Sequence, residues 1–540
     1  MTDTQQWWRG AAIYQIYPRS FADGNGDGVG DVAGIRARLA HLRDLGVDAL
    51  WISPWYVSPM ADAGYDVADF RDIDPLFGTL AEAEALIREA HAMDLRVIVD
   101  MVPNHCSDQH SWFRAALAAG PGSPERARFH FRAGRGESGE LPPNDWPSHF
   151  GGPAWHRVIE ADGTAGEWYL HLFAPGQPDF NWDNPEVREE FEAVLRFWLD
   201  RGVDGFRIDV ADNLVKDPAL PDLASVPENG RSPVHDQDAV HDIYRSWRRI
   251  ADSYPGQRIF VGELWLADRE RFARYLRPDE LHTGFNFPFL QAGFDAGRMR
   301  AVIDDTLAAH APVGAVPTWV LSNHDTTRHV TRYGRADSSY GFDRRRLHGT
   351  PVDLELGTRR ARAAALLTMA LPGCVYVYQG DELGLWEVED IPEHLIQDPA
   401  FHGTAGADPG RDGCRVPLPW EGDEAPFGFS PDATTDPWLP QPPAWKDHTV
   451  AAQTGDPDST LELYRTALHV RRAEPALGGG ELTWLDAGED VLAFTRPGGF
   501  TCVVNFSERA VDLPEHHERL LASGPLDHGR LPSATAAWLR

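Results

Sequence analysis

The stretch Arg96–Asn104, which reads RVIVDMVPN, carries the pattern that decides the fold. Its β-branched run Val97–Val99 is typical of a buried strand, and a polar residue follows where the strand pattern ends. Helical patterns separate this stretch from other runs of the same kind. Seven further runs occur, at Ala12–Pro18, Val47–Pro54, Gly205–Val210, Arg258–Leu264, Thr283–Phe287, Thr318–Asp325 and Cys374–Glu382. Strands that alternate with helices predict a parallel sheet joined by helical crossovers.

Eight such strands are the number that closes a barrel, so the predicted fold class is α/β, a (β/α)8 TIM barrel. Barrels of this kind carry their chemistry in the loops at the carboxyl ends of the strands. Polar and charged residues gather at several of the predicted strand ends. They are Asn104 and His105, Arg207 and Asp209, Glu263, Asn323–Asp325 and Gln379–Glu382.

Two long segments interrupt the predicted barrel. About 100 residues rich in Gly, Pro, Trp and His separate the third and fourth strands, which is too long for a simple crossover. We therefore expect an inserted domain over 105–177, with the barrel occupying 1–104 and 178–475. The second segment, a Pro-rich loop over 381–456, also has a length that usually accompanies function.

The end of the chain has a different pattern. A helix-like stretch at Leu461–Arg472 is followed by short alternating segments at Val491–Thr495 and Thr501–Phe506. These predict a C-terminal β-sandwich over 476–540.

The composition of the chain argues against nucleic acid and membranes as binding partners. Fifty Lys and Arg against 82 Asp and Glu give a net charge of −32, which would repel nucleic acid and anionic lipid. No apolar run approaches the roughly 20 residues of a membrane helix, and Met1–Arg9 lacks an export signal. Four Cys without a CxxC pair fit a reducing compartment. We expect a cytoplasmic protein with no nucleic-acid or membrane partner, either a monomer or a homodimer.

The strand-end motifs together resemble a known family. They are DMVPNH at 100–105, GFRID at 205–209, GE at 262–263, SNHD at 322–325 and QPDFNW at 177–182. From Trp7 to Phe506 the chain is similar to the α-amylase superfamily, glycoside hydrolase family 13, in its oligo-1,6-glucosidase and α-glucosidase branch. The last motif is typical of the branch that acts on oligosaccharides.

The resemblance implies three catalytic carboxylates. Glycoside hydrolysis needs one carboxylate at the oxocarbenium-like centre and one acid that assists the leaving oxygen. By the family pattern, Asp209 is the nucleophile, Glu263 the general acid and then base, and Asp325 the carboxylate that holds sugar hydroxyls. Arg207 lies two residues before Asp209, so strand alternation places both on one face. We expect this guanidinium to keep Asp209 ionised.

The resemblance also implies residues that bind the glucosyl unit. His105 and His324 are expected to bind its hydroxyls, and Tyr65 to stack on its apolar face. Asp66 is expected to take further hydroxyls. Arg411 corresponds to a family arginine that pairs with Asp66 and closes the non-reducing end of the pocket.

A candidate cation loop follows the first strand. Residues 23–31, DGNGDGVGD, present oxygen donors at every second position with Gly between them, as at the start of a calcium loop. The distal Glu of an EF-hand is missing. The resemblance implies a structural Ca²⁺, or else Mg²⁺, and a solvated turn is the alternative. The candidate ligands are Asp23, Asn25, Asp27, Asp31 and the carbonyl of Val29.

The predicted function is a retaining, exo-acting α-glucosidase that releases glucose from short α-glucosides through a covalent glucosyl-Asp209 intermediate. Val210 after the nucleophile is typical of α-1,6 activity, but Ala211–Asn213 departs from familiar sequences, so both α-1,4 and α-1,6 bonds stay open. The Trp-rich stretches Trp146–Trp155 and Glu167–Phe173 are either core or the wall that receives the leaving group.

Three rival functions were weighed. A sucrose isomerase or trehalose synthase would share every catalytic residue and differ in how water is excluded. Heavy subunits of amino-acid transporters keep this fold but lose the carboxylates, all of which are present here. A polysaccharide-degrading α-amylase is disfavoured by Gln177–Trp182.

Overall fold

The predicted barrel is confirmed. A computed structural model describes residues 6–227, 230–341, 347–431 and 435–540. Its main sheet has eight parallel strands in the order β11-β10-β9-β5-β2-β1-β13-β12. A parallel bridge between Phe285 and Thr318 joins the two ends of this order and closes the ring. The strands are β1 (Ala12–Ile16), β2 (Ala49–Ile52), β5 (Arg96–Met101), β9 (Gly205–Ile208), β10 (Ile259–Gly262), β11 (Thr283–Gly284), β12 (Thr318–Val320) and β13 (Cys374–Tyr378).

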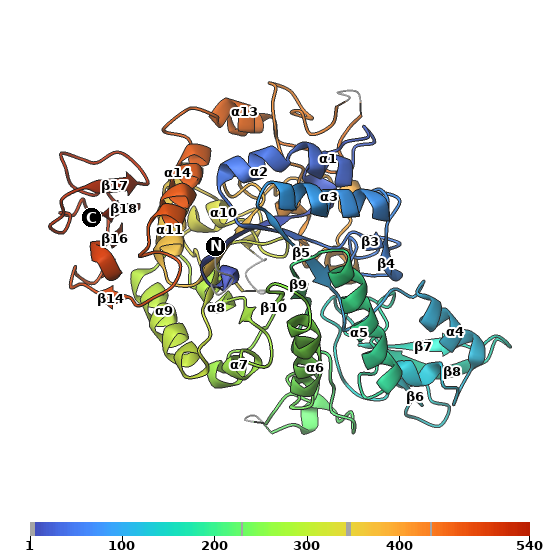
Figure 1. The fold of residues 1–540 in the computed structure, drawn as a ribbon. Coiled ribbons are helices and arrows are strands. Elements are labelled where there is room, and N and C mark those ends of the chain that lie inside the picture. Colours follow the sequence, from blue (N-terminus) through green and yellow to red (C-terminus); the bar gives the residue numbers. More distant parts are fainter. Residues whose placement is uncertain (1–5, 228–229, 342–346, 432–434) are drawn as a thin grey trace.

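Helices surround the barrel, as Figure 1 shows. Several bury one apolar face: α5 places Val187, Phe191 and Trp198 inward at helical spacing, after an Asn184 N-cap and a Pro at its first position. Others, such as α10, are buried on all sides. The helices that flank the barrel or lie in its loops are α1 (Val32–Ala37), α2 (Leu39–Leu45), α3 (Leu80–Ala92), α5 (Pro185–Asp200), α6 (Val240–Asp252), α7 (Arg269–Tyr275), α8 (Phe287–Gln291), α9 (Ala296–His310), α10 (His329–Tyr333), α11 (Leu354–Ala370) and α14 (Thr460–Ala473).

Alternation along the strands separates two cores. Trp51, Ile98 and Val261 belong to a cluster inside the barrel. Their sequence neighbours, such as Leu50 and Val97, belong to the larger cluster beneath the helices. Successive strand residues point to opposite faces, so the barrel interior is filled and the polar strand ends are left to form a site above it.

The segment between β5 and β9 carries a small sheet of its own. It has the order β6-β8-β7, with β6 at Phe131–Arg132, β7 at Trp155–Ile159 and β8 at Ala165–Leu170, and α4 (Ser111–Ala119) precedes it. A bridge between His105 and Asp179 brings its two ends side by side. Trp146 and Trp155 are buried in this region, so they are core residues.

The remaining elements lie in the loops and at the C-terminus. After β2 comes the hairpin β3 (Tyr56–Val57) and β4 (Asp69–Ile73), and the long loop holds α12 (Pro399–Gly403) and α13 (Val450–Gln453). The C-terminal sheet is antiparallel, as predicted. Its strands in order are β14 (Thr483–Trp484), β15 (Val491–Thr495), β16 (Thr501–Asn505), β18 (Thr535–Leu539) and β17 (Arg519–Ala522).

The C-terminal sheet has two covered faces. Trp538 packs toward the barrel and donates to the carbonyl of Leu366 in α11 at 3.1 Å. The other face forms an apolar cluster with Val511 and Leu531, which pair in an isolated bridge. The second layer of the predicted sandwich is thus irregular chain. Among the described helices, none is long and apolar enough to cross a membrane.

Candidate active site

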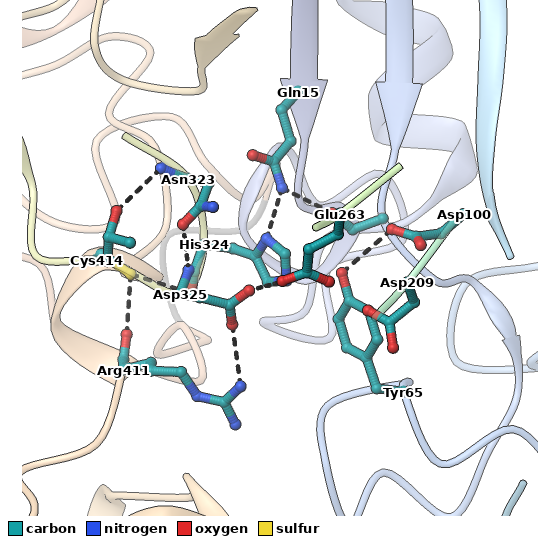
Figure 2. A network of polar contacts seen from close by, with 12 residues as sticks. Gln15, Tyr65, Asp100, Asp209, Glu263, Asn323, His324, Asp325, Arg411 and Cys414 are labelled. Atoms are coloured by element: carbon teal, nitrogen blue, oxygen red, sulfur yellow. Dashed lines mark hydrogen bonds and ion pairs between the residues drawn. The ribbon is translucent and has the colours of Figure 1, made fainter. Parts of the chain in front are cut away.

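A cavity of about 460 Å³ lies where the strand-end residues converge. Seven of the site residues predicted from the sequence line this cavity, and Figure 2 shows several of them pointing toward one another. The seven are Tyr65, His105, Asp209, Glu263, His324, Asp325 and Arg411. Side chains from distant parts of the chain therefore meet around one space large enough for a sugar.

Arg207 holds the two proposed reacting carboxylates. Its Nη1 donates to Asp209 Oδ1 at 2.6 Å and to Asp100 Oδ1 at 3.0 Å, while its Nη2 donates to Glu263 Oε2 at 2.6 Å. The guanidinium is fully buried beneath the cavity. Because Asp209 and Glu263 bind neighbouring nitrogens of one planar group, their spacing and orientation are fixed together. Two closely held carboxyl groups are the arrangement that retaining glycoside hydrolysis requires.

Burial and neighbouring carboxylates act against the ionised form of Asp209. Burial raises the pKa of Asp209 well above its usual value, and Glu263 and Asp100 add to this effect, which Arg207 only partly opposes. Arg207 contacts Asp209, as strand alternation predicts, but Asp100 and Glu263 share the same guanidinium.

Asp325 has the opposite environment. Its Oδ1 accepts from Arg411 Nη1 at 3.0 Å and from Arg415 Nη2 at 3.1 Å, and His324 Nε2 lies 3.1 Å from its Oδ2. Burial opposes ionisation, but His324 and the two arginines outweigh it and hold the pKa of Asp325 far below its usual value. Asp325 is therefore held as an anion at the wall of the cavity.

The aromatic residues and histidines form a rigid, uncharged wall. The rings of Tyr65 and His324 stack with centroids 5.2 Å apart. Gln15 donates to His324 Nδ1 at 2.7 Å, so the ring hydrogen lies on Nε2, toward Asp325. Burial lowers the pKa of His105 to about 4 and that of His324 well below its usual value. Near neutral pH both rings are therefore neutral.

The prediction for Asp66 was wrong. Its carboxylate is fully buried and accepts from Ser58 Oγ and from the backbone N–H groups of Ala61 and Asp62, each at 2.9 Å. The partner of Arg411 is Asp62, whose Oδ1 accepts from Nη2 at 2.8 Å and which lines the cavity. The loop reverses direction between the two residues, so Asp66 shapes the turn that presents Asp62.

Sequence reasoning also missed several residues that line the cavity. Trp265 lines the wall two residues after Glu263, and its place directly beyond a predicted strand end was a usable signal. Of the Trp-rich stretches, Phe150 and Phe173 reach the cavity. His149 of the first stretch also lines it, as do Val210, Asp212 and Asn213, which the sequence analysis linked to bond preference. His235 and Asp408 are the lining residues without a predicted role.

Val210, directly after Asp209, has an unusual backbone conformation. Its φ of 35° is unusual for a β-branched residue. In this conformation its backbone N–H donates to Glu263 Oε2 at 3.0 Å. The turn after β9 therefore helps to fix the proposed acid.

The carboxylate oxygens of the candidate cation loop accept hydrogen bonds from backbone N–H groups within and beside the loop. Asp23 accepts from the N–H groups of Gly26 and Gly28, Asp27 from that of Val29, and Asp31 caps α1 through Gly34. Oxygen donors of this kind suit a hard cation. In the described ranges, however, no group of three or more acidic, His or Cys side chains is placed to hold a metal ion. The Ca²⁺ or Mg²⁺ site therefore stays a prediction.

Asp27→Ala tests this loop. If the loop binds calcium, the variant should melt at a lower temperature, by about 1 °C for each kcal/mol of lost binding energy in a chain of this length. Chelator should lower the melting temperature of the wild type but not that of the variant, and activity at low temperature should be preserved. Melting that responds to neither change would identify a solvated turn.

Comparison with known proteins gives consistent matches. The family model described as the alpha amylase catalytic domain matches residues 15–480. A probable alpha-glucosidase of Rhizobium meliloti is 41% identical over 94% of this chain and 90% of its own. An oligo-1,6-glucosidase of Parageobacillus thermoglucosidasius is 33% identical over 94% and 92%. A solved isomaltulose synthase variant from Erwinia rhapontici, bound to its natural substrate sucrose, aligns with a TM-score of 0.85 at 30% identity, covering 99% of both chains.

Proposed function

Because the chain belongs to the α-amylase catalytic-domain family of glycoside hydrolases, we propose that it is a retaining, exo-acting α-glucosidase that releases glucose from short α-glucosides. One observation carries the proposal. Asp209 and Glu263 share the buried guanidinium of Arg207 at the floor of a pocket that also holds Asp325.

The proposed reaction has two steps. Asp209 attacks the anomeric carbon while Glu263 gives a proton to the leaving oxygen, and a β-glucosyl ester forms on Asp209. Glu263, now a carboxylate, then takes a proton from water as the water oxygen bonds to the same carbon and Asp209 leaves. Two inversions give a product of retained configuration. Asp325 holds ring hydroxyls throughout, because its arginine partners keep it anionic.

The contacts of Arg411 support the exo mode. Its guanidinium donates to Asp62 at 2.8 Å, to Asp325 at 3.0 Å and to Asp398 at 2.5 Å. Asp398 lies in the long loop, at the N-cap of α12. A buried network of this kind costs much to open, since each broken contact leaves an unpaired charge. We infer that this network closes one end of the pocket and leaves room beside Asp325 for a terminal glucosyl unit.

A transglucosylase that isomerises sucrose is the second candidate. The structural similarity to isomaltulose synthase supports it. Such an enzyme would use the same carboxylates and let the released sugar, rather than water, attack the glucosyl ester.

A product panel distinguishes the two functions. The protein is incubated in parallel with maltose, isomaltose, sucrose and trehalose, and every product is identified by NMR. Glucose released from maltose or isomaltose, first as its α-anomer, is the expected result. Isomaltulose or trehalose formed in place of glucose would favour the transglucosylase. A β-anomer as first product would contradict a retaining mechanism.

A further inference from the structure

Trp265 contacts the proposed acid directly. It follows β10 two residues after Glu263, lines the cavity, and donates from Nε1 to Glu263 Oε1 at 2.9 Å. Its ring stacks on Phe287 with centroids 3.8 Å apart and an interplanar angle of 6°. Because Phe287 is buried, this packing fixes the direction of the indole N–H.

The two oxygens of Glu263 have different partners. Oε2 accepts from Arg207 Nη2 at 2.6 Å and from the backbone N–H of Val210 at 3.0 Å, which uses both of its lone pairs. A proton on Glu263 therefore resides on Oε1, the oxygen beside Trp265. The indole N–H occupies one lone pair of Oε1 and leaves the O–H to point elsewhere, toward the cavity.

We propose that Trp265 is a positioning residue that fixes and strengthens Glu263 in the proton-transfer step. This inference rests on the proposed function. As the bond from the anomeric carbon to the leaving oxygen breaks, Oε1 gives its proton to that oxygen and becomes anionic. A hydrogen bond from N–H to an anionic oxygen is stronger than one to a neutral acid. The indole thus stabilises the transition state more than the ground state, which is the condition for faster chemistry.

Trp265→Phe tests the proposal, because it keeps an aromatic ring and removes the N–H. The kcat/KM for maltose and isomaltose should fall about 10- to 100-fold, the rate equivalent of one hydrogen bond to a charged group. For 2,4-dinitrophenyl α-glucoside, whose leaving group departs without a proton, kcat/KM should fall less than about twofold. A merely structural role would lower both values together.

Two further variants complete the test. Trp484→Phe is the matched control: that indole donates to Asp304 Oδ1 at 2.6 Å on the C-terminal sheet, and its loss should leave both values unchanged. Benzothienylalanine at position 265 keeps the bicyclic shape and replaces N–H with sulfur. It should reproduce the selective loss even if Trp265→Phe proves unstable in a melting assay.

The outcomes are distinguishable. Equal losses on all three glucosides in a folded variant, or full disaccharide activity with benzothienylalanine, would overturn the role of Trp265 alone. A wild-type protein that cleaves none of the three glucosides would overturn the proposed function, and the inference with it.

Discussion

Asp209→Asn is expected to reduce kcat/KM for α-glucosides on the order of 10⁴-fold or more, as deletion of a covalent catalyst does. The amide has nearly the same shape but cannot form the glucosyl ester. The fold should remain intact, because Arg207 keeps Asp100 and Glu263 as partners. Burial raises the pKa of Asp209, so the ionised side chain costs stability at neutral pH, and the neutral amide should melt at the same or a higher temperature.

Trapping experiments sharpen this test. A fluorinated glucosyl substrate that accumulates the intermediate should label the wild type on the peptide that contains Asp209, and mass spectrometry would detect it. With added azide, the variant should form β-glucosyl azide, because azide replaces the missing carboxylate in a single inversion. Asp242→Asn, at an exposed position on α6, serves as the control. Near-normal turnover in Asp209→Asn, or a label on another residue, would contradict the assignment.

Glu263→Gln is expected to affect substrates according to their leaving groups. For disaccharides, kcat/KM should fall about 10²- to 10⁴-fold, the range of general acid catalysis. For activated aryl glucosides the loss should be far smaller, since their leaving groups depart as anions. Azide attacks the glucosyl ester without help from a general base, so it should restore the second step in this variant. The product should be α-glucosyl azide, whereas Asp209→Asn should give the β-anomer.

An equal loss on both substrate classes would count against an acid role for Glu263. A melting curve is the needed companion, because Glu263 accepts three hydrogen bonds from Arg207, Val210 and Trp265. The amide of Gln can accept with only one oxygen. We therefore expect Glu263→Gln to be somewhat less stable than the wild type. This does not affect the comparison between substrate classes, because both are measured on the same variant.

The barrel and the positions of its eight strands along the chain were predicted from local signals. Strand alternation, helical spacing and turn residues act over a few positions, so short runs such as Val97–Val99 reveal them without knowledge of the rest of the chain. The same applies to Asp209, Glu263 and Asp325, which lie where strands end and within motifs that resemble the family. Their convergence in one cavity is a consequence of parallel strands that close into a ring.

Other features depended on where the chain turns in space. Asp62 and Asp66 lie four residues apart in a loop. Only the conformation of this loop decides that Asp62 pairs with Arg411 while Asp66 accepts hydrogen bonds from backbone N–H groups. Likewise, Trp146 is core whereas Phe150 reaches the cavity, although both belong to one aromatic stretch.

Sequence alone predicted the barrel and a C-terminal β-domain, because periodicity and turn residues are local signals. The three carboxylates were predicted from the resemblance of the strand-end motifs to the family. Tertiary structure decided which carboxylates share Arg207, which carboxylate pairs with Arg411, and the contact between Trp265 and Glu263. Each of these depends on burial and on distances between groups far apart in the chain or set by an irregular loop. Such distances are fixed only when the whole barrel has closed.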